Sequence, residues 1–179
     1  MKEYYISEVE RVSQKLSKYR NCFKFAIVAD SHIDNSIQDT FSNIKEVHKN
    51  VNFNCLVHLG DFLNGNLPKH YTKAVLKDQM DGFRSSVGGK CFYPVQGNHD
   101  GFCDLTKSGG ISANIALDED WYEATKCVNN AKCDNVRYAD DRALQTVNQD
   151  CWDAVVLKQK ERKVYIYRFG WGEDRVLEY

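Results

Sequence analysis

The sequence has no long hydrophobic run. No stretch of its 179 residues approaches the roughly 18 unbroken apolar residues that a membrane-spanning helix needs. Residues 1–13 are a charged mixture without the apolar core of a signal peptide. These absences lead us to expect a soluble, cytoplasmic protein with no membrane partner.

An excess of charge of one sign is also absent. Lys and Arg number 24 against 25 Asp and Glu, so the formal net charge is −1. Without a basic surplus or a long Lys/Arg run, no sequence-wide field would hold a polyanion. We therefore expect no nucleic-acid partner, apart from a nucleotide as a substrate.

The cysteines lack the spacing of a zinc ribbon. There are seven, an odd number, and no two form the short C-x2-C pairs that such a site requires. Cys22, Cys55 and Cys91 lie in or beside apolar runs, where cysteine usually behaves as a small buried hydrophobe. Reduced thiols and no structural zinc are the expectation.

Large side chains are plentiful. Apolar residues make up 42% of the chain and aromatic residues 12%, which excludes the composition of a disordered protein. The length suits one domain with its own core. We expect a single domain over 1–179, with a βαβαβ half at 1–100, a poorly defined connection at 101–135 and a β segment at 136–179.

Three short apolar runs alternate with helical patterns in the first half. Residues 23–28, 55–59 and 91–95 have the composition of strands covered on both faces. Between them, residues 37–51 and 75–87 carry apolar side chains at helical spacing. Strands separated by helices predict a parallel sheet.

The ends of the chain add two further predictions. Apolar residues at spacings of three and four predict a helix over 6–16. Near the carboxyl terminus, residues 154–157 and 164–169 flank a polar turn, which predicts a β-hairpin, and 175–179 could add an edge strand.

Metal-binding types of side chain follow each of the three predicted parallel strands. They are Asp30 and His32 after the first strand, Asp61 after the second, and Asn98, His99 and Asp100 after the third. Ligands of open α/β sheets collect at the carboxyl ends of the strands, so these groups should meet in space.

Carboxylates gathered in this way repel one another by about 4 kcal/mol per pair at 4 Å and an effective dielectric of 20. A cation would neutralise them, and mixed oxygen and imidazole ligands suit Mn, Fe or Zn. A shared carboxylate can bridge two ions, so a dinuclear site is the natural hypothesis. The alternative is a purely structural role, in which Asp and Asn occupy these positions only because they suit turns.

Three short motifs carry a family resemblance. Asp30-Ser31-His32, Gly60-Asp61 and Gly97 to Asp100 resemble the D-x-H, G-D and G-N-H-[D/E] motifs of the calcineurin-like metallophosphoesterases. The resemblance covers 23–100 and 150–179. It implies an α/β fold of the αββα sandwich type, abbreviated here, with a parallel βαβαβ amino-terminal half and a carboxyl-terminal antiparallel hairpin.

The resemblance also implies roles for individual residues. Asp30 and His32 would bind a first metal, Asp61 would bridge two metals and Asn98 would bind the second. His99 would be catalytic, contacting the substrate phosphate and stabilising or protonating the leaving oxygen. Separately from the resemblance, the position of Asp34 and Asp100 near the site leads us to expect that they tune it electrostatically or cap a turn.

The chain departs from the family pattern after residue 100. Members of the family carry a further strand-end histidine and a G-H-x-H motif, whereas the last histidine of this chain is His99. The second metal therefore keeps only Asp61 and Asn98 from the usual set. Substitutes could come from six acidic residues: Asp100, Asp104, Asp118, Glu119, Asp120 and Asp140.

The expected function is metal-dependent hydrolysis of a small phosphate mono- or diester by a metal-activated hydroxide, with one or two divalent ions per chain. The alternative is a catalytically inactive binding or interaction module derived from such an enzyme. A nucleotide-binding domain of the flavodoxin or Rossmann type ranks last, because no G-x-G-x-x-G motif or P-loop follows any strand. His58, inside the second strand, is expected to be a hydrogen-bonded core residue.

Overall fold

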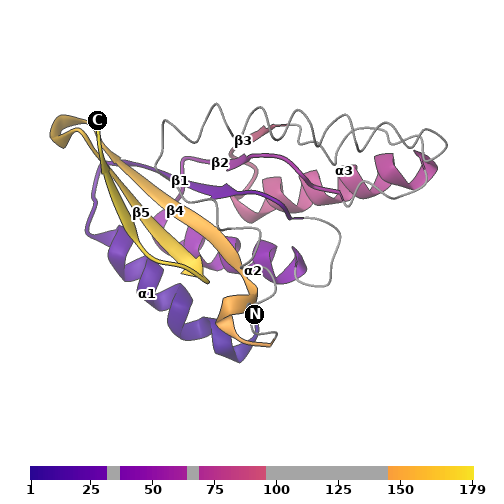
Figure 1. Cartoon of the computed structure of the whole chain (residues 1–179), viewed down its shortest axis with the longest axis horizontal. Coiled ribbons are helices and arrows are strands. Elements are labelled where there is room, and N and C mark those ends of the chain that lie inside the picture. The colour runs from indigo at the N-terminus through magenta and orange to yellow at the C-terminus, as the bar shows by residue number, and fades with distance from the viewer. Residues whose placement is uncertain (32–36, 64–68, 96–144) are drawn as a thin grey trace, which may run out of the picture.

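The computed structural model describes residues 1–31, 37–63, 69–95 and 145–179. These residues form one six-stranded mixed sheet in the order β3-β2-β1-β4-β5-β6, with three helices on one of its faces (Figure 1). Among these described residues there is no second sheet of the kind that a sandwich requires, and the expected connection at 101–135 lies outside them.

The first half alternates helices and parallel strands as predicted. A short 3-10 turn, Glu3–Tyr5, leads into α1, and the other elements follow in the order of the chain. They are α1 (Ile6–Ser17), β1 (Phe23–Val28), α2 (Ile37–Val51), β2 (Cys55–His58), α3 (Lys69–Ser86) and β3 (Cys91–Pro94). Both β2–β1 and β3–β2 are parallel pairs, so the carboxyl ends of β1, β2 and β3 share one edge of the sheet.

The carboxyl-terminal strands extend this sheet in antiparallel fashion. A 3-10 turn, Val147–Gln149, precedes β4 (Cys151–Lys158), and a second, Gln159–Glu161, joins it to β5 (Lys163–Gly170). Strands β4 and β5 form the hairpin, and β6 (Arg175–Glu178) pairs with the outer side of β5. Because β4 runs antiparallel to β1 with Asp153 opposite Ile27, β4 begins at the edge where β1 ends.

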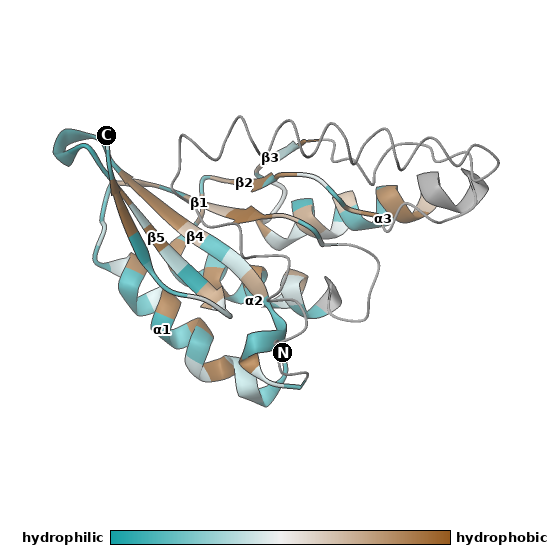
Figure 2. Ribbon diagram, in the orientation of Figure 1, coloured by the Kyte–Doolittle hydropathy of each residue, from teal (hydrophilic) through white to brown (hydrophobic). Residues whose placement is uncertain are grey.

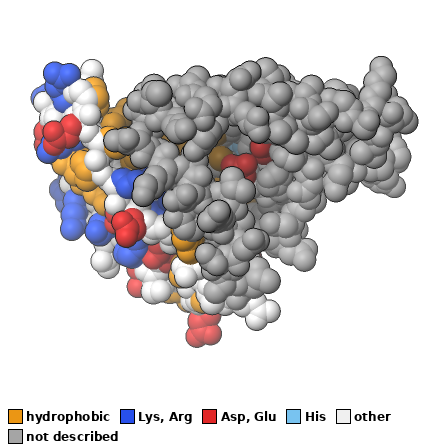
Figure 3. Space-filling view, viewed as in Figure 1, with side chains coloured by type: hydrophobic (Ala, Val, Ile, Leu, Met, Phe, Trp, Pro, Cys, Tyr) orange, Lys and Arg blue, Asp and Glu red, His pale blue; other side chains and the backbone are white. Residues whose placement is uncertain are grey.

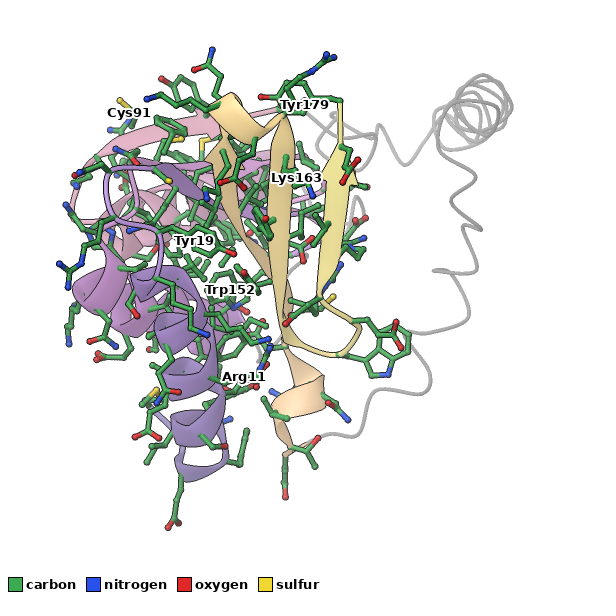
Figure 4. All side chains as sticks on the ribbon, turned by 90° about the vertical axis from the view of Figure 1, so that its left-hand side faces the viewer. Arg11, Tyr19, Cys91, Trp152, Lys163 and Tyr179 are labelled. Carbon is green, nitrogen blue, oxygen red and sulfur yellow. The ribbon has the colours of Figure 1, made fainter. Side chains whose placement is uncertain are left out.

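The core lies between the sheet and the helices. Alternate residues of the strands face inward, and Trp152 of β4 stacks on Phe169 of β5 at 4.9 Å between ring centroids. Trp152 lies between the hairpin and α1 (Figure 4). The residues of α1 alternate between hydrophobic and hydrophilic along its length (Figure 2), and its buried side includes the predicted Val9, Val12 and Leu16.

Some expectations about burial were wrong. The third strand, β3, is an edge strand whose residues are exposed except for a partly covered Phe92, and Cys91 is exposed rather than buried. In β1, Phe23 is 47% exposed on the face away from the helices. An apolar run identifies a strand, but its place in the sheet decides how many faces are covered.

The start of α3 also differs from expectation. Helix α3 begins at Lys69, six residues before the first position of the predicted pattern, while the apolar positions Phe83 and Val87 are buried as expected.

In the part of the chain that the structure describes, no helix is both long and apolar enough to cross a membrane.

Candidate metal centre

Asp30 and Asp61 lie just beyond the carboxyl ends of the neighbouring strands β1 and β2. The pairing of these strands continues into the turns that follow them. The Leu59 amide donates to the Val28 carbonyl at 2.9 Å, and the Asp30 amide donates to the Gly60 carbonyl at 3.0 Å. The backbone therefore holds the turns that carry the two aspartates side by side, at the strand ends where the sequence predicted them.

Both aspartates have a left-handed backbone. The φ angle is 51° at Asp30 and 57° at Asp61, and Gly60 between β2 and Asp61 has φ 108°. Aspartate tolerates this region better than most residues with a Cβ, but the conformation still costs free energy. Such strain concentrates at functional sites, where the position of a side chain matters more than local stability.

The third strand ends at the same edge. The amide of Val95, the residue after β3, donates to the carbonyl of His58 at 2.8 Å, so the chain leaving β3 still runs beside β2. The other predicted site residues follow this point or the end of β1, and all lie outside the described residues. They are His32, Asp34, Asn98, His99 and Asp100.

The six acidic residues considered as substitute ligands, which lie between 100 and 140, are outside the described residues too. Within the described ranges no three His, Cys, Asp or Glu side chains gather closely enough to hold a metal ion. The structure thus brings together two of the predicted ligands, Asp30 and Asp61. The metal-binding role of every one of the predicted ligands, these two included, stays a prediction.

His58 is buried behind these two turns. It is fully inaccessible to solvent, its Nδ1 accepts the Gly60 amide at 3.1 Å, and its Nε2 lies 2.8 Å from Ser31 Oγ. Ser31 also donates to Gln79 Oε1 of α3 at 3.2 Å. The expectation of a hydrogen-bonded core histidine is confirmed, but the partners, which flank Asp30 and Asp61, were not foreseen.

A second buried polar group lies near this edge, at the start of β4. The carboxylate of Asp150 is 4% exposed and accepts hydrogen bonds at 2.8 Å from both Thr40 and Asn43 of α2. Burial raises the pKa of Asp150, although the hydrogen bonds from Asn43 and Thr40 oppose this shift. Asp150 ties α2, which follows the Asp30 turn, to the hairpin. The sequence offered only its position before an apolar strand as a signal.

Two arginines lie on the carboxyl-terminal strands β5 and β6. Arg168 of β5 and Arg175 of β6 both contact the carboxylate of Asp153, at 2.9 and 2.7 Å. Burial raises the pKa of Asp153, and the two guanidinium groups counteract this effect. In Figure 3, Lys and Arg side chains alternate with Asp and Glu side chains over the side of the molecule formed by the hairpin and α1, and further acidic atoms are visible near the middle of the view.

Comparisons with known proteins bear on this arrangement. A comparison with curated proteins gave no match. Among solved structures, the chain is similar to a dimetal phosphatase from Danio rerio, with 19% identity and a TM-score of 0.35. That match covers 44% of this chain and 30% of the phosphatase chain.

The match to a family model covers more of the chain. The model described as calcineurin-like phosphoesterase matches residues 23–167, which include the three motifs and most of the hairpin. This is well over half of the 179 residues. The chain therefore belongs to the calcineurin-like phosphoesterase family.

Proposed function

We propose that this chain is a metal-dependent phosphoesterase that hydrolyses a small phosphate mono- or diester. The family generally catalyses phosphoester hydrolysis with divalent metal ions. The observation that carries the proposal is the placement of Asp30 and Asp61 on adjacent strand-end turns, joined by the hydrogen bond from the Asp30 amide to the Gly60 carbonyl.

The chemistry of Asp30 and Asp61 suits a divalent ion. Two carboxylates on neighbouring strand ends repel each other unless a cation lies between them, and carboxylate oxygens are ligands that Mn²⁺, Fe or Zn accept. We propose that Asp30 and His32 hold one ion, Asp61 is shared, and Asn98 holds a second. When bound, such ions lower the pKa of a coordinated water toward 7 and offset charge on the phosphoryl oxygens.

The side chains of the protein supply the remaining functions. In this proposal His99 stabilises or protonates the leaving oxygen of the substrate, as a general acid does. Asp34 and Asp100 adjust the electrostatic potential at the site. Arg168 and Arg175 add positive charge on the carboxyl-terminal strands, which would favour the approach of a phosphate anion.

One observation favours a second candidate function. No histidine follows His99, so the second ion has fewer ligands than the family pattern provides. We expect weak binding of that ion, completed by water, and correspondingly slow turnover. If turnover is absent while the first ion binds, the chain is a binding or interaction module that keeps only half of the centre.

The test is hydrolysis of p-nitrophenyl phosphate and its bis ester by the protein supplied with Mn²⁺, against a blank with metal alone. Hydrolysis above the blank supports the enzyme. A variant His99→Ala is expected to bind metal normally and to lose this activity. Hydrolysis that is unchanged in His99→Ala would exclude the proposed role of His99.

Metal analysis of demetallated and reloaded protein completes this test. We expect Asp61→Asn to lower bound Mn²⁺ at least tenfold. The matched control is Asp81→Asn on α3, an exposed aspartate paired with Lys77, which should leave metal content unchanged. Equal metal content in the two variants would remove Asp61 from the centre, and no metal in the unmodified chain would end both candidate functions.

A further inference from the structure

His58 is the one fully buried histidine among the described residues, and it lies three positions before Asp61. Its ring stacks on Phe62 with centroids 3.6 Å apart and meets Phe83 edge-on at 4.8 Å. An imidazole enclosed by aromatic rings in this way needs hydrogen-bond partners for both nitrogens, because an unpaired buried polar atom is costly. Both nitrogens have such partners.

The partners define the direction of the hydrogen bonds. The Gly60 amide can only donate, so Nδ1 of His58 is the unprotonated nitrogen and Nε2 carries the proton. Nε2 then donates to Ser31 Oγ, which leaves the Ser31 hydroxyl free to donate to Gln79 Oε1. A single directed chain therefore runs from the turn after β2, through the turn after β1, to α3.

The two turns joined by this chain are those of the candidate metal centre. Gly60 directly precedes Asp61, and Ser31 directly follows Asp30. The backbone bond from the Asp30 amide to the Gly60 carbonyl links the same two turns a second time. Two links, one through a side chain and one through the backbone, restrict the distance and the relative orientation of the two turns.

We propose that His58 is a positioning residue that locks the turns presenting Asp30 and Asp61 against each other before metal binds. The metal part of this inference rests on the proposed function. Two neighbouring carboxylates repel each other in the absence of a cation, so a preformed site needs a restraint that opposes their separation. Residues that orient metal ligands in this way typically change metal affinity by about 10- to 100-fold when they are replaced.

The first experiment uses the metal-free protein and amide hydrogen exchange by NMR. We compare exchange of the Asp30 amide with that of Ala154, which lies in the central strand β4. The measured quantity is the exchange rate of the Asp30 amide divided by that of the Ala154 amide. In His58→Phe, which keeps an aromatic ring, this ratio should rise at least tenfold. In His48→Phe, the same change at a histidine of α2 that packs on Phe53, the ratio should stay unchanged.

A second pair of variants keeps the test valid if His58→Phe does not fold. Ser31→Ala removes the acceptor of the Nε2 proton and should raise the same exchange ratio, whereas Ser31→Thr keeps a hydroxyl and should restore it. In the unmodified protein, the ¹⁵N shifts of His58 should show an unprotonated Nδ1 and a protonated Nε2. An unchanged ratio in both His58→Phe and Ser31→Ala would overturn the inference.

Mn²⁺ titration then connects the restraint to the centre. His58→Phe and Ser31→Ala should each weaken Mn²⁺ affinity by about 10- to 100-fold, and their combination should add little, because both remove the same hydrogen bond. Affinity in either folded variant equal to that of the unmodified chain would overturn the link to metal. If the unmodified chain binds no Mn²⁺, the proposed function fails while the exchange ratios still decide the role of His58.

Discussion

At the residue scale, Asp61 occupies a backbone conformation that suits its place in the site better than it suits stability. Its φ of 57° is in the left-handed region, which costs a residue with a Cβ roughly 1–2 kcal/mol and costs glycine nothing. We therefore expect metal-free Asp61→Gly to be more stable than Asp61→Ala by about 1 kcal/mol. Urea unfolding monitored by circular dichroism measures this difference.

Asp81 provides the matched control for this prediction. It is exposed in the interior of α3, where alanine favours the helix and glycine does not. The order should reverse there, with Asp81→Gly less stable than Asp81→Ala by about 1 kcal/mol. If alanine were also the better residue at position 61, the left-handed conformation of Asp61 would be wrong.

At the element scale, the end of β5 packs directly on the start of β4 through Gly170. This glycine has φ 82°, and a Cβ placed on it would lie 1.9 Å from the carbonyl oxygen of Asp150. A backbone oxygen at a strand end has little room to move away. We expect Gly170→Ala to destabilise the protein by about 3 kcal/mol or more, since overpacking adds to the left-handed strain.

Gly89, after α3, separates these two contributions. Its φ is 73°, but no atom in the described parts of the chain lies within 4 Å of the Cβ it would carry. Gly89→Ala should therefore cost only about 1 kcal/mol, the strain alone. Thermal or urea unfolding of both variants tests the contrast, and similar losses at the two positions would contradict the close approach of β5 to Asp150.

At the scale of the whole molecule, the hairpin completes the sheet that carries the candidate site. β4 pairs with β1 along five residues and brings Trp152 into the core, where it packs on Phe169 and Phe53. Losing a buried aromatic side chain costs about 3–5 kcal/mol, and total stabilities are about 5–15 kcal/mol. A chain ending at residue 149 should therefore fail to fold.

Removing β6 alone is a matched comparison. All four residues of β6 are exposed, and its ion pairs from Arg175 to Asp153 and from Lys163 to Glu178 involve partly exposed groups. A chain ending at residue 174 should stay folded and lose about 1–2 kcal/mol. Circular dichroism and size-exclusion chromatography distinguish the two truncations, and a folded 1–149 chain would show that the hairpin is dispensable.

Much of the fold was predictable because local patterns and tertiary structure agree. The apolar runs of β1, β2, β4 and β5 and the helical spacing in α1 gave the correct elements. The apolar run of β3 predicted a strand but not an exposed edge, because neighbour order within a sheet is set by contacts distant in sequence. Sequence patterns likewise did not indicate that Lys69 begins α3.

The amino-acid sequence by itself determined which side chains follow the strands and in what order. It places an aspartate after each of two strands, in motifs that resemble those of one family. Residue type and local spacing suffice for this, since a strand end is recognisable from a few neighbouring residues. Only the tertiary structure decided that Gly60 and Ser31 meet at His58, and that Asp150 joins α2 to the hairpin. Such partners are distant along the chain, and packing alone brings them within hydrogen-bond distance.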